Sequence, residues 1–409
     1  MGLDLTSFDA ALKQHYTNDR VEDMVYKRNP FLALLTKMEQ FGGKNLPIPI
    51  IYGNPQGRSK TFGNAKTRGA ATSTKVDDFV LTRVKDYSIA TIDNETLEAS
   101  KGDANAFMTA FSTEVDGAIN SLTRSIAIGV FRDSSAAIGQ VLATPSNASP
   151  WVITLKQSSD VTNFELQQVI NIWSAKSGGT QRSSDGSDTS WVVVAVDRDA
   201  GTITLDGTYS GSGTIAANDY IFIEGDRGLG ISGLSDWIPD SAPGSTLFFG
   251  VNRSVDVTRL GGLRMDGTGL PIEEALIEGD AKVNREGFYI DHYFMNPKKL
   301  ADLKKALGTK VQYVTLQANA RISFTGVMVD GDKGPITCLA DFNCPYDHIY
   351  GLAMEYWKLY SLGKAVRPVP SDGLDMLRQD TADGVEVRYG FYGNLATRAP
   401  GSNIVITYS

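Results

Sequence analysis

A glycine run is the motif in this sequence that most invites a chemical interpretation. Gly228, Gly230 and Gly233 match the G-x-G-x-x-G spacing of dinucleotide-binding loops, and the run follows a predicted strand. In such loops the glycines must open a helix whose N-terminus receives the pyrophosphate. Here residues 234–239 follow, which are too few for that helix and end in Pro239. We therefore interpret the run as a flexible glycine link between domains.

Histidines and cysteines give no catalytic or metal-binding pattern. His15, His292 and His348 lack the H-x-H and H-E-x-x-H spacings of metal sites. Cys338 and Cys344 are too few for a four-thiolate site, so we expect two reduced, partly buried thiols, with a disulfide or a metal role as the alternative. The sequence also has no Walker loop and no G-x-S-x-G elbow. It therefore predicts neither an enzyme nor a bound cofactor.

Charge and hydropathy narrow the class of protein further. The 409 residues include 39 basic and 47 acidic side chains, which gives a net charge of −8. Proteins that grip DNA with their main surface are usually basic, whereas an acidic surface can lie near packed nucleic acid without adhering to it. No apolar run of about 18 residues or more occurs, and the N-terminus does not have the pattern of a secretory signal. We expect two or three domains, synthesis in the cytoplasm and no membrane span.

The elements that could position functional residues begin with a cationic hairpin. Pro47 and Pro49 make residues 46–52 extended, and residues 76–92 alternate partly between apolar and polar side chains. Between these runs, residues 53–74 contain no acid, and Phe62 is their one large apolar residue. The cations of this segment are Arg58, Lys60, Lys66 and Arg68. Because the whole chain carries −8 and this segment +4, the remainder carries −12.

A hairpin whose tip has no core cannot be stabilised by its own burial. We therefore expect the tip to rest on an acidic surface of a neighbouring copy. A mobile, solvated loop is the alternative.

The clearest predicted helix covers residues 103–131. Residues 100–103 fit a capping box, and one apolar stripe recurs at steps of three or four residues. The stripe consists of Phe107, Phe111, Val115, Ile119, Leu122, Ile126 and Val130. Such a stripe indicates a core-facing helix. Shorter helices are predicted in the N-terminal arm, around the apolar cluster 31–38, and at residues 271–286 and 296–308.

Strand patterns dominate the middle and the end of the chain. Short strands at 151–155, 169–173, 191–197, 202–205 and 220–224 predict a small sandwich or barrel inserted into a host domain. We interpret Trp151, Trp173 and Trp191 as its aromatic core, with stacking on sugars as the alternative. From residue 227 the pattern is mixed α and β, with late strands at 349–360, 385–392 and 404–408.

The order of these parts resembles the Hong Kong 97 type fold of the major capsid proteins of tailed bacteriophages. Residues 87–100, which run into the long helix, resemble that family's passage from extended loop to spine helix. Ser-Leu-Gly-Lys at 361–364, Asp-Gly-Leu at 372–374 and the stretch 380–393 resemble the C-terminal half of one branch of phage capsid proteins. The resemblance covers most of residues 1–145 and 227–409.

The resemblance implies an α+β fold with six parts. These are an N-terminal arm (1–41), an extended loop hairpin (42–92), a peripheral domain with the spine helix (93–145), an inserted all-β domain (146–226), an axial domain with connections (227–385) and a C-terminal return to the peripheral domain (386–409).

The resemblance also implies a structural, non-enzymatic protein of the virion, without cofactors. Copies would assemble as pentamers and hexamers into an icosahedral shell around the double-stranded DNA genome, held without sequence-specific contacts. Expected partners are a separate scaffolding protein, because residues 1–41 leave no room for a scaffolding extension, then the portal and, optionally, a decoration protein. A Lys–Asn cross-link from Lys60 or Lys66 is not expected. The expected inter-subunit contacts are Arg58, Lys60, Phe62, Lys66 and Arg68.

Two alternatives stay open. One is a nanocompartment shell protein of the same fold. The other is a carbohydrate-binding or carbohydrate-active β-rich protein.

Overall fold

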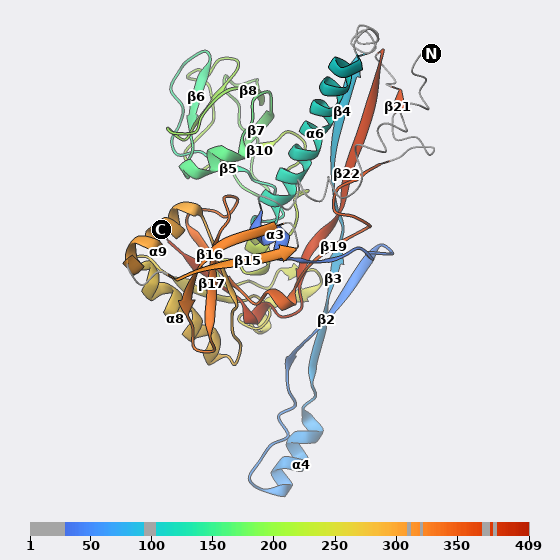
Figure 1. Ribbon diagram of the computed structural model, residues 1–409. Coiled ribbons are helices and arrows are strands. Elements are labelled where there is room, and N and C mark those ends of the chain that lie inside the picture. Colours follow the sequence, from blue (N-terminus) through green and yellow to red (C-terminus); the bar gives the residue numbers. More distant parts are fainter. Residues whose placement is uncertain are drawn as a thin grey trace.

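The computed structural model describes residues 29–93, 104–308, 312–319, 322–369, 377–378 and 383–408. Two six-stranded sheets and one seven-stranded sheet form the body, and a long hairpin projects away from it (Figure 1). The fold is thus mixed α and β. His15, most of the predicted arm, the capping box at 100–103 and the phrase at 372–374 lie outside the described residues.

The long helix α6 (Ala104–Gly129) packs against the first six-stranded sheet, on strands β4 (Val84–Asp93) and β22 (Gly384–Thr397). The remaining strands of this sheet are β1 (Thr36–Met38), β19 (Trp357–Ser361), β20 (Arg367–Pro368) and β21 (Leu377–Arg378). The predicted apolar stripe is confirmed where side chains are described, since Val115, Ile119, Leu122, Ile126 and Val130 are buried. The helix lies with its apolar face on the sheet, which confirms the prediction of a core-facing helix.

The seven-stranded sheet forms a second part, in the order β13-β23-β18-β14-β17-β16-β15. Its strands are β13 (Leu263–Asp266), β14 (His292–Met295), β15 (Gln312–Asn319), β16 (Ile322–Asp330), β17 (Pro335–Ala340), β18 (His348–Leu352) and β23 (Ile404–Thr407). Helices α8 (Ile272–Arg285) and α9 (Pro297–Leu307) contact this sheet and each other. Asn296 caps α9 by accepting a hydrogen bond from the Lys298 N–H (3.1 Å), which confirms the helix predicted at 296–308.

The second six-stranded sheet builds a β module, residues 138–226. Its strands are β5 (Gly139–Gln140), β6 (Trp151–Thr154), β7 (Val169–Trp173), β8 (Ser190–Asp197), β9 (Thr202–Leu205) and β10 (Tyr220–Ile223), in the order β5-β10-β7-β8-β9-β6. The sheet closes on itself, because the N–H groups of Leu142 and Lys156 donate to the carbonyls of Thr154 and Gln140 (2.9 and 2.8 Å). It takes in β5 and so extends beyond the predicted insert 146–226 toward the N-terminus.

The β module has its own core, separate from the two other hydrophobic clusters of the described chain. Trp151 and Trp191 are buried there, with ring centroids 5.3 Å apart and planes at 90°. Both are therefore core residues, as we interpreted them, and neither is free to stack on a sugar. Trp173 is half-buried, and the Arg227 guanidinium lies 3.9 Å from its ring centroid.

The late strands differ from their prediction. Residues 349–360 do not form one strand, because a 3₁₀ turn at Met354–Tyr356 separates β18 from β19 and sends them into different sheets. The Asn403 side chain holds this corner, accepting hydrogen bonds from the Ala353 N–H (3.0 Å) and the Trp357 indole (2.9 Å).

Two strands of the predicted C-terminal return, 386–409, lie in different sheets. Strand β22 joins the sheet under α6, but β23 lies in the seven-stranded sheet between β13 and β18. Ile404, Val405 and Ile406 are fully buried. A continuous apolar run of this kind suits a central strand covered on both faces.

The glycine run is packed and is not a flexible link, so that prediction was wrong. A Cβ at Gly233 would lie 2.3–2.6 Å from the carbonyl oxygens of Gly129, Val130 and Arg132 at the end of α6. Gly233 also caps the four-residue helix α7 (Leu234–Trp237), whose Trp237 is buried. Gly233 thus allows the chain to cross the end of α6 closely.

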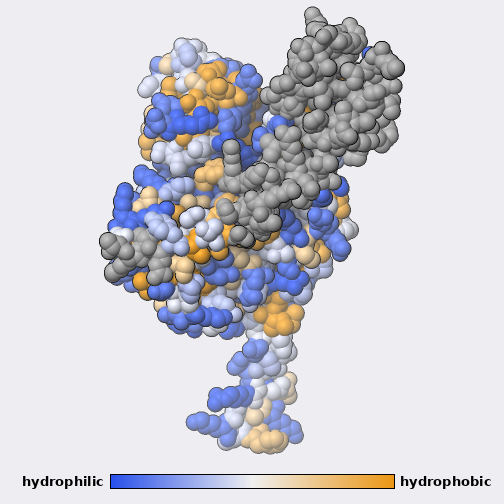
Figure 2. Space-filling view, viewed as in Figure 1, coloured by the Kyte–Doolittle hydropathy of each residue, from blue (hydrophilic) through white to orange (hydrophobic). Residues whose placement is uncertain are grey.

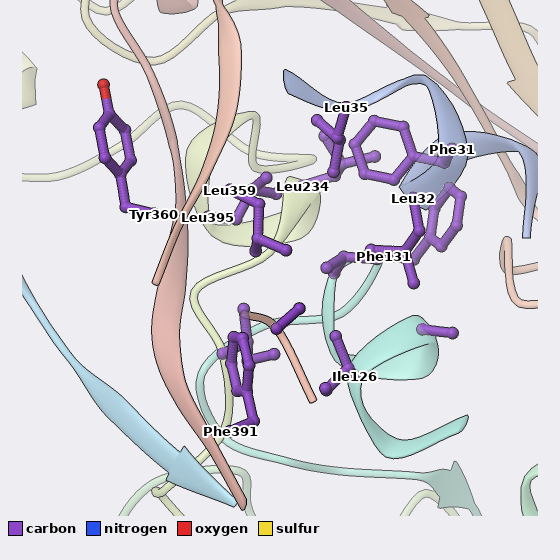
Figure 3. Close-up of a cluster of buried hydrophobic side chains, with 14 of the residues drawn as sticks. Phe31, Leu32, Leu35, Ile126, Phe131, Leu234, Leu359, Tyr360, Phe391 and Leu395 are labelled. Atoms are coloured by element: carbon purple, nitrogen blue, oxygen red, sulfur yellow. The ribbon is translucent and has the colours of Figure 1, made fainter. Parts of the chain in front are cut away.

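The largest core cluster joins the described end of the N-terminal arm to α6 and to both neighbouring sheets. Figure 3 shows Phe31, Leu32 and Leu35 near Phe131, beyond the end of α6. The Phe31 ring centroid lies 5.2 Å from that of Phe131 and 5.1 Å from that of Phe294 on β14. The short helix α3 (Pro30–Leu34), with Pro30 in its first turn, thereby wedges between two parts of the body. It is shorter than the predicted cluster 31–38, because residues 36–38 form strand β1.

Two titratable groups with little exposed surface, Asp341 and His348, lie in the body. Asp341 is buried and accepts a hydrogen bond from the Phe31 N–H (3.3 Å), and burial raises its pKa to about 6. His348 lies between Asp347 (2.6 Å) and Asp240 (2.9 Å). Burial lowers the pKa of His348, but its hydrogen bonds and charges with both carboxylates outweigh this and raise the pKa to about 9.

The cysteines are free and buried, which confirms two reduced thiols in the described chain. Burial raises the pKa of the Cys338 and Cys344 thiols. Both are therefore poor nucleophiles at neutral pH.

Candidate interaction surface

The projecting hairpin is built from β2 (Asn45–Gly53) and β3 (Lys75–Thr82), which pair antiparallel. Ile48 lies opposite Phe79, and both are buried in the main core together with Ile50 and Leu81. Buried and exposed side chains alternate along both strands, so one face of the hairpin base packs against the body. Nine extended residues span about 30 Å, so the hairpin carries its far end well away from the body (Figure 1).

The far end of the hairpin is a helix, which the sequence prediction missed. Helix α4 (Phe62–Ala71) contains no buried residue, and none of residues 53–75 is buried. Gly57 and Gly69 let the loop approach the helix, since a Cβ at Gly57 would lie 2.9 Å from the Gly69 Cα. The Gln56 N–H donates to Thr72 Oγ1 (3.0 Å) across the same gap. Isolated helices of this length are marginal in water, so the tip is suited to stabilisation by an outside surface.

The five predicted contact residues lie together on this tip, which we define as residues 54–74. Arg58 and Lys60 precede α4, and Phe62, Lys66 and Arg68 lie on it. All five are exposed, and Phe62 has 86% of its surface accessible. The Arg68 guanidinium donates to the Arg58 carbonyl (3.3 Å), which keeps these two cations close.

None of the four tip cations forms an ion pair with an acidic residue in the part of the chain that the structure describes. A solvated charge on a narrow projection can stay unpaired at little cost in free energy. It nevertheless attracts any acidic surface that it reaches. Figure 2 shows the projection with hydrophilic and hydrophobic residues side by side at its end. The tip can therefore bind a surface that offers carboxylates around an apolar contact for Phe62.

The hairpin stem adds a second exposed feature. Ile51 and Val76 lie directly opposite each other on the face away from the core, with 66% and 57% of their surfaces accessible. Pro47 and Pro49 are exposed on the same face of β2. The sequence could have predicted this exposed face. Pro47, Pro49 and Ile51 are odd-numbered and Ile48 is even-numbered, so they lie on the face of the strand opposite to the buried Ile48.

A cleft of about 560 Å³ lies between α6, β4 and the β module. Asp86 on β4 and Asp226 beyond β10 line it, and the Ser125 hydroxyl of α6 donates to Asp86 (2.6 Å). Burial and the nearby Asp86 charge raise the pKa of Asp226 to about 6. Ion pairs Arg124–Glu165 and Arg132–Asp160 tie the β module to the α6 side of this cleft.

A metal site and a membrane-spanning helix are both absent from the described residues. Among the described residues there is no group of three or more His, Cys, Asp or Glu side chains arranged to hold a metal ion. Nor does that part of the chain contain a helix long and apolar enough to cross a membrane. The exposed tip therefore remains the best-defined candidate site.

No protein-family model matches the sequence, and a search of curated proteins finds no match. Solved structures do resemble the fold. One is a chain of the capsid asymmetric unit of cyanophage A-1(L), with 12% identity, coverage of 93% of each chain and a TM-score of 0.49. A chain from Mycobacterium phage Ogopogo has 8% identity, coverage of 94% of this chain and 93% of that one, and a TM-score of 0.45.

The encapsulin complex of Synechococcus elongatus is a third similar structure. It has 8% identity, coverage of 92% of this chain and 87% of that one, and a TM-score of 0.42.

Proposed function

We propose that this chain is the major capsid protein of a tailed bacteriophage, with the Hong Kong 97 type fold. Copies assemble as pentamers and hexamers into the icosahedral shell that encloses the double-stranded DNA genome. The observation that carries this proposal is the projecting hairpin with a coreless, cationic tip on a chain that is otherwise acidic. The protein is structural and has no catalytic role.

The hairpin supports head-to-tail assembly. A projection that binds a different surface on the next copy makes a heterologous contact, and such contacts generate rings when the rotation closes. Because the tip carries +4 and the remainder of the chain −12, each copy attracts the tip of another. Phe62 would add an apolar contact at the centre of the charged tip.

The other parts take the roles that the sequence resemblance implies. Residues 42–92 are the extended loop, α6 is the spine helix, and the β module is the inserted domain. The seven-stranded sheet corresponds to the axial domain, near the five-fold and six-fold centres. A separate scaffolding protein, the portal and, optionally, a decoration protein are the proposed partners in the virion.

Charge reversal at the tip tests this proposal. We expect Arg58→Glu or Arg68→Glu to weaken assembly, and more at low salt than at high salt, because each exposed ion pair contributes only about 0–1 kcal/mol and is screened. Particle yield is measured by sedimentation over a salt series. Lys44→Glu is the matched control, since this exposed cation lies at the hairpin base, outside the tip. An equal loss at all salt concentrations would argue against electrostatic docking of the tip.

The nanocompartment alternative differs in what the shell contains. Shells purified from producing cells should hold DNA if the capsid proposal is correct, and protein cargo without a genome if the alternative holds. The carbohydrate alternative is not favoured, because Trp151 and Trp191 lie in the core of the β module.

A further inference from the structure

The β module is joined to the body by two chain segments that cross near the end of α6. Its hydrophobic core shares no residue with either of the other clusters of the described chain. Where the outgoing and returning segments cross, the N–H groups of Gly228 and Gly230 donate to the carbonyls of Ser135 and Ser134 (2.9 and 3.1 Å). The module is therefore a separately packed body on a narrow connection, and it can turn only as one unit about this crossing.

Beyond the connection, charged side chains tie the module to α6. Arg124 of α6 pairs with Glu165 of the module, and Arg132, just after α6, pairs with Asp160 of the module (2.6 Å). The side chains of Arg124 and Glu165 keep 31% and 52% of their surfaces accessible, so dissolved salt screens this pair. An exposed pair of this kind holds only weakly.

Two unpaired carboxylates act in the opposite direction. Asp86 on β4 and Asp226 just beyond β10 line the cleft that separates α6 and β4 from the module. Neither carboxylate forms an ion pair with a cation within the described residues. Burial, and then the charge of Asp86, raise the pKa of Asp226, so the two groups repel each other across the cleft. The cleft is thus drawn together by one set of charges and pushed apart by another.

We propose that the β module is a clasp that turns about the crossing of its two connecting segments. Its closed position is held by the Arg124–Glu165 pair, and its open position is favoured by Asp86 and Asp226. Salt shifts the balance toward the open position, because it screens the exposed pair more than it screens the charges inside the cleft. The motion belongs to a single copy, so the test does not depend on the proposed function.

The distance between two spin labels on the full chain tests the clasp. One label is placed by Thr154→Cys on the outer face of β6, and the other by Glu114→Cys on an exposed position of α6. Cys338 and Cys344 are buried and do not take up the label. Labelled chain is diluted into unlabelled chain, so that only distances within one copy are measured by pulsed electron paramagnetic resonance.

We expect a second, longer distance whose population rises with salt. Between about 0.01 M and about 1 M salt its share should grow roughly two- to fivefold, the range that the loss of one exposed ion pair allows. Arg124→Gln should produce this increase already at low salt. Asp226→Asn should instead reduce the population of the longer distance, because it removes the repulsion across the cleft.

Arg198→Gln is the matched control. Arg198 pairs with the same Glu165 (3.2 Å), but both residues belong to the module, so this change removes an ion pair without untying the module from α6. It should leave the distances unchanged. A single distance that neither salt nor Arg124→Gln alters would overturn the clasp. An equal response to Arg124→Gln and Arg198→Gln would show that the Arg124–Glu165 pair is not the latch.

Discussion

Replacing Phe31 by alanine should release the N-terminal arm from the body. Phe31 is fully buried between Phe131 and Phe294, and removing a buried phenylalanine costs about 3–5 kcal/mol. A local loss of that size corresponds to at least a hundredfold larger population of the released arm, since 1.4 kcal/mol is a factor of ten. Release of the arm is reported by the backbone amides of Leu35 and Phe41, which donate to the carbonyls of Phe31 and Ser361, respectively (both 3.1 Å).

Hydrogen exchange measured by mass spectrometry gives the test. Peptides covering residues 29–41 should lose protection by about a hundredfold or more, while peptides from the β module, which has its own core, should change little. Phe62→Ala is the matched control: the same deletion at an exposed position should change stability by less than about 0.5 kcal/mol. Unchanged protection at residues 29–41 in the Phe31 variant would refute the assignment of Phe31 as the anchor of the arm.

Three further predictions concern pH and packing. The stabilising contribution of charged His348 is complete below pH 6.5 and is lost as pH rises through about 9, so His348→Gln should flatten the fall in Tm between pH 7 and 9. Asp341 has a raised pKa, so its site favours the protonated acid and stability should decrease as pH rises from about 4 through 6; Asp341→Asn should remove this decrease in urea titrations. Gly233→Ala should destabilise by roughly 3 kcal/mol, because its Cβ would overlap three carbonyl oxygens, whereas Gly244→Ala, with open space around it, should be nearly neutral in thermal unfolding.

Elements with strong local patterns could be predicted from the sequence. The stripe from Val115 to Val130 placed α6, and the proline-bounded strand at 46–52 placed the hairpin. The five residues predicted as inter-subunit contacts, Arg58 to Arg68, could be grouped because they are close in sequence and their segment contains no acid. Local composition was enough in these cases because the elements are built from neighbouring residues.

Features that depend on distant contacts could not be predicted in this way. The corner between β18 and β19 is set by Asn403, which lies about fifty residues later in the chain. The place of β23 between β13 and β18 is likewise a matter of tertiary pairing that periodicity does not encode. The tip helix α4 was missed because Gly63 and Gly69 lower helix propensity.

The central claim is that copies of this chain assemble into a shell. Negative-stain electron microscopy of the purified, overexpressed protein, with sedimentation alongside, tests it most directly. The account predicts closed shells, tubes, or rings of five and six subunits, from the chain alone or with its co-expressed scaffolding protein. A chain that stays a monodisperse monomer under both conditions would contradict it.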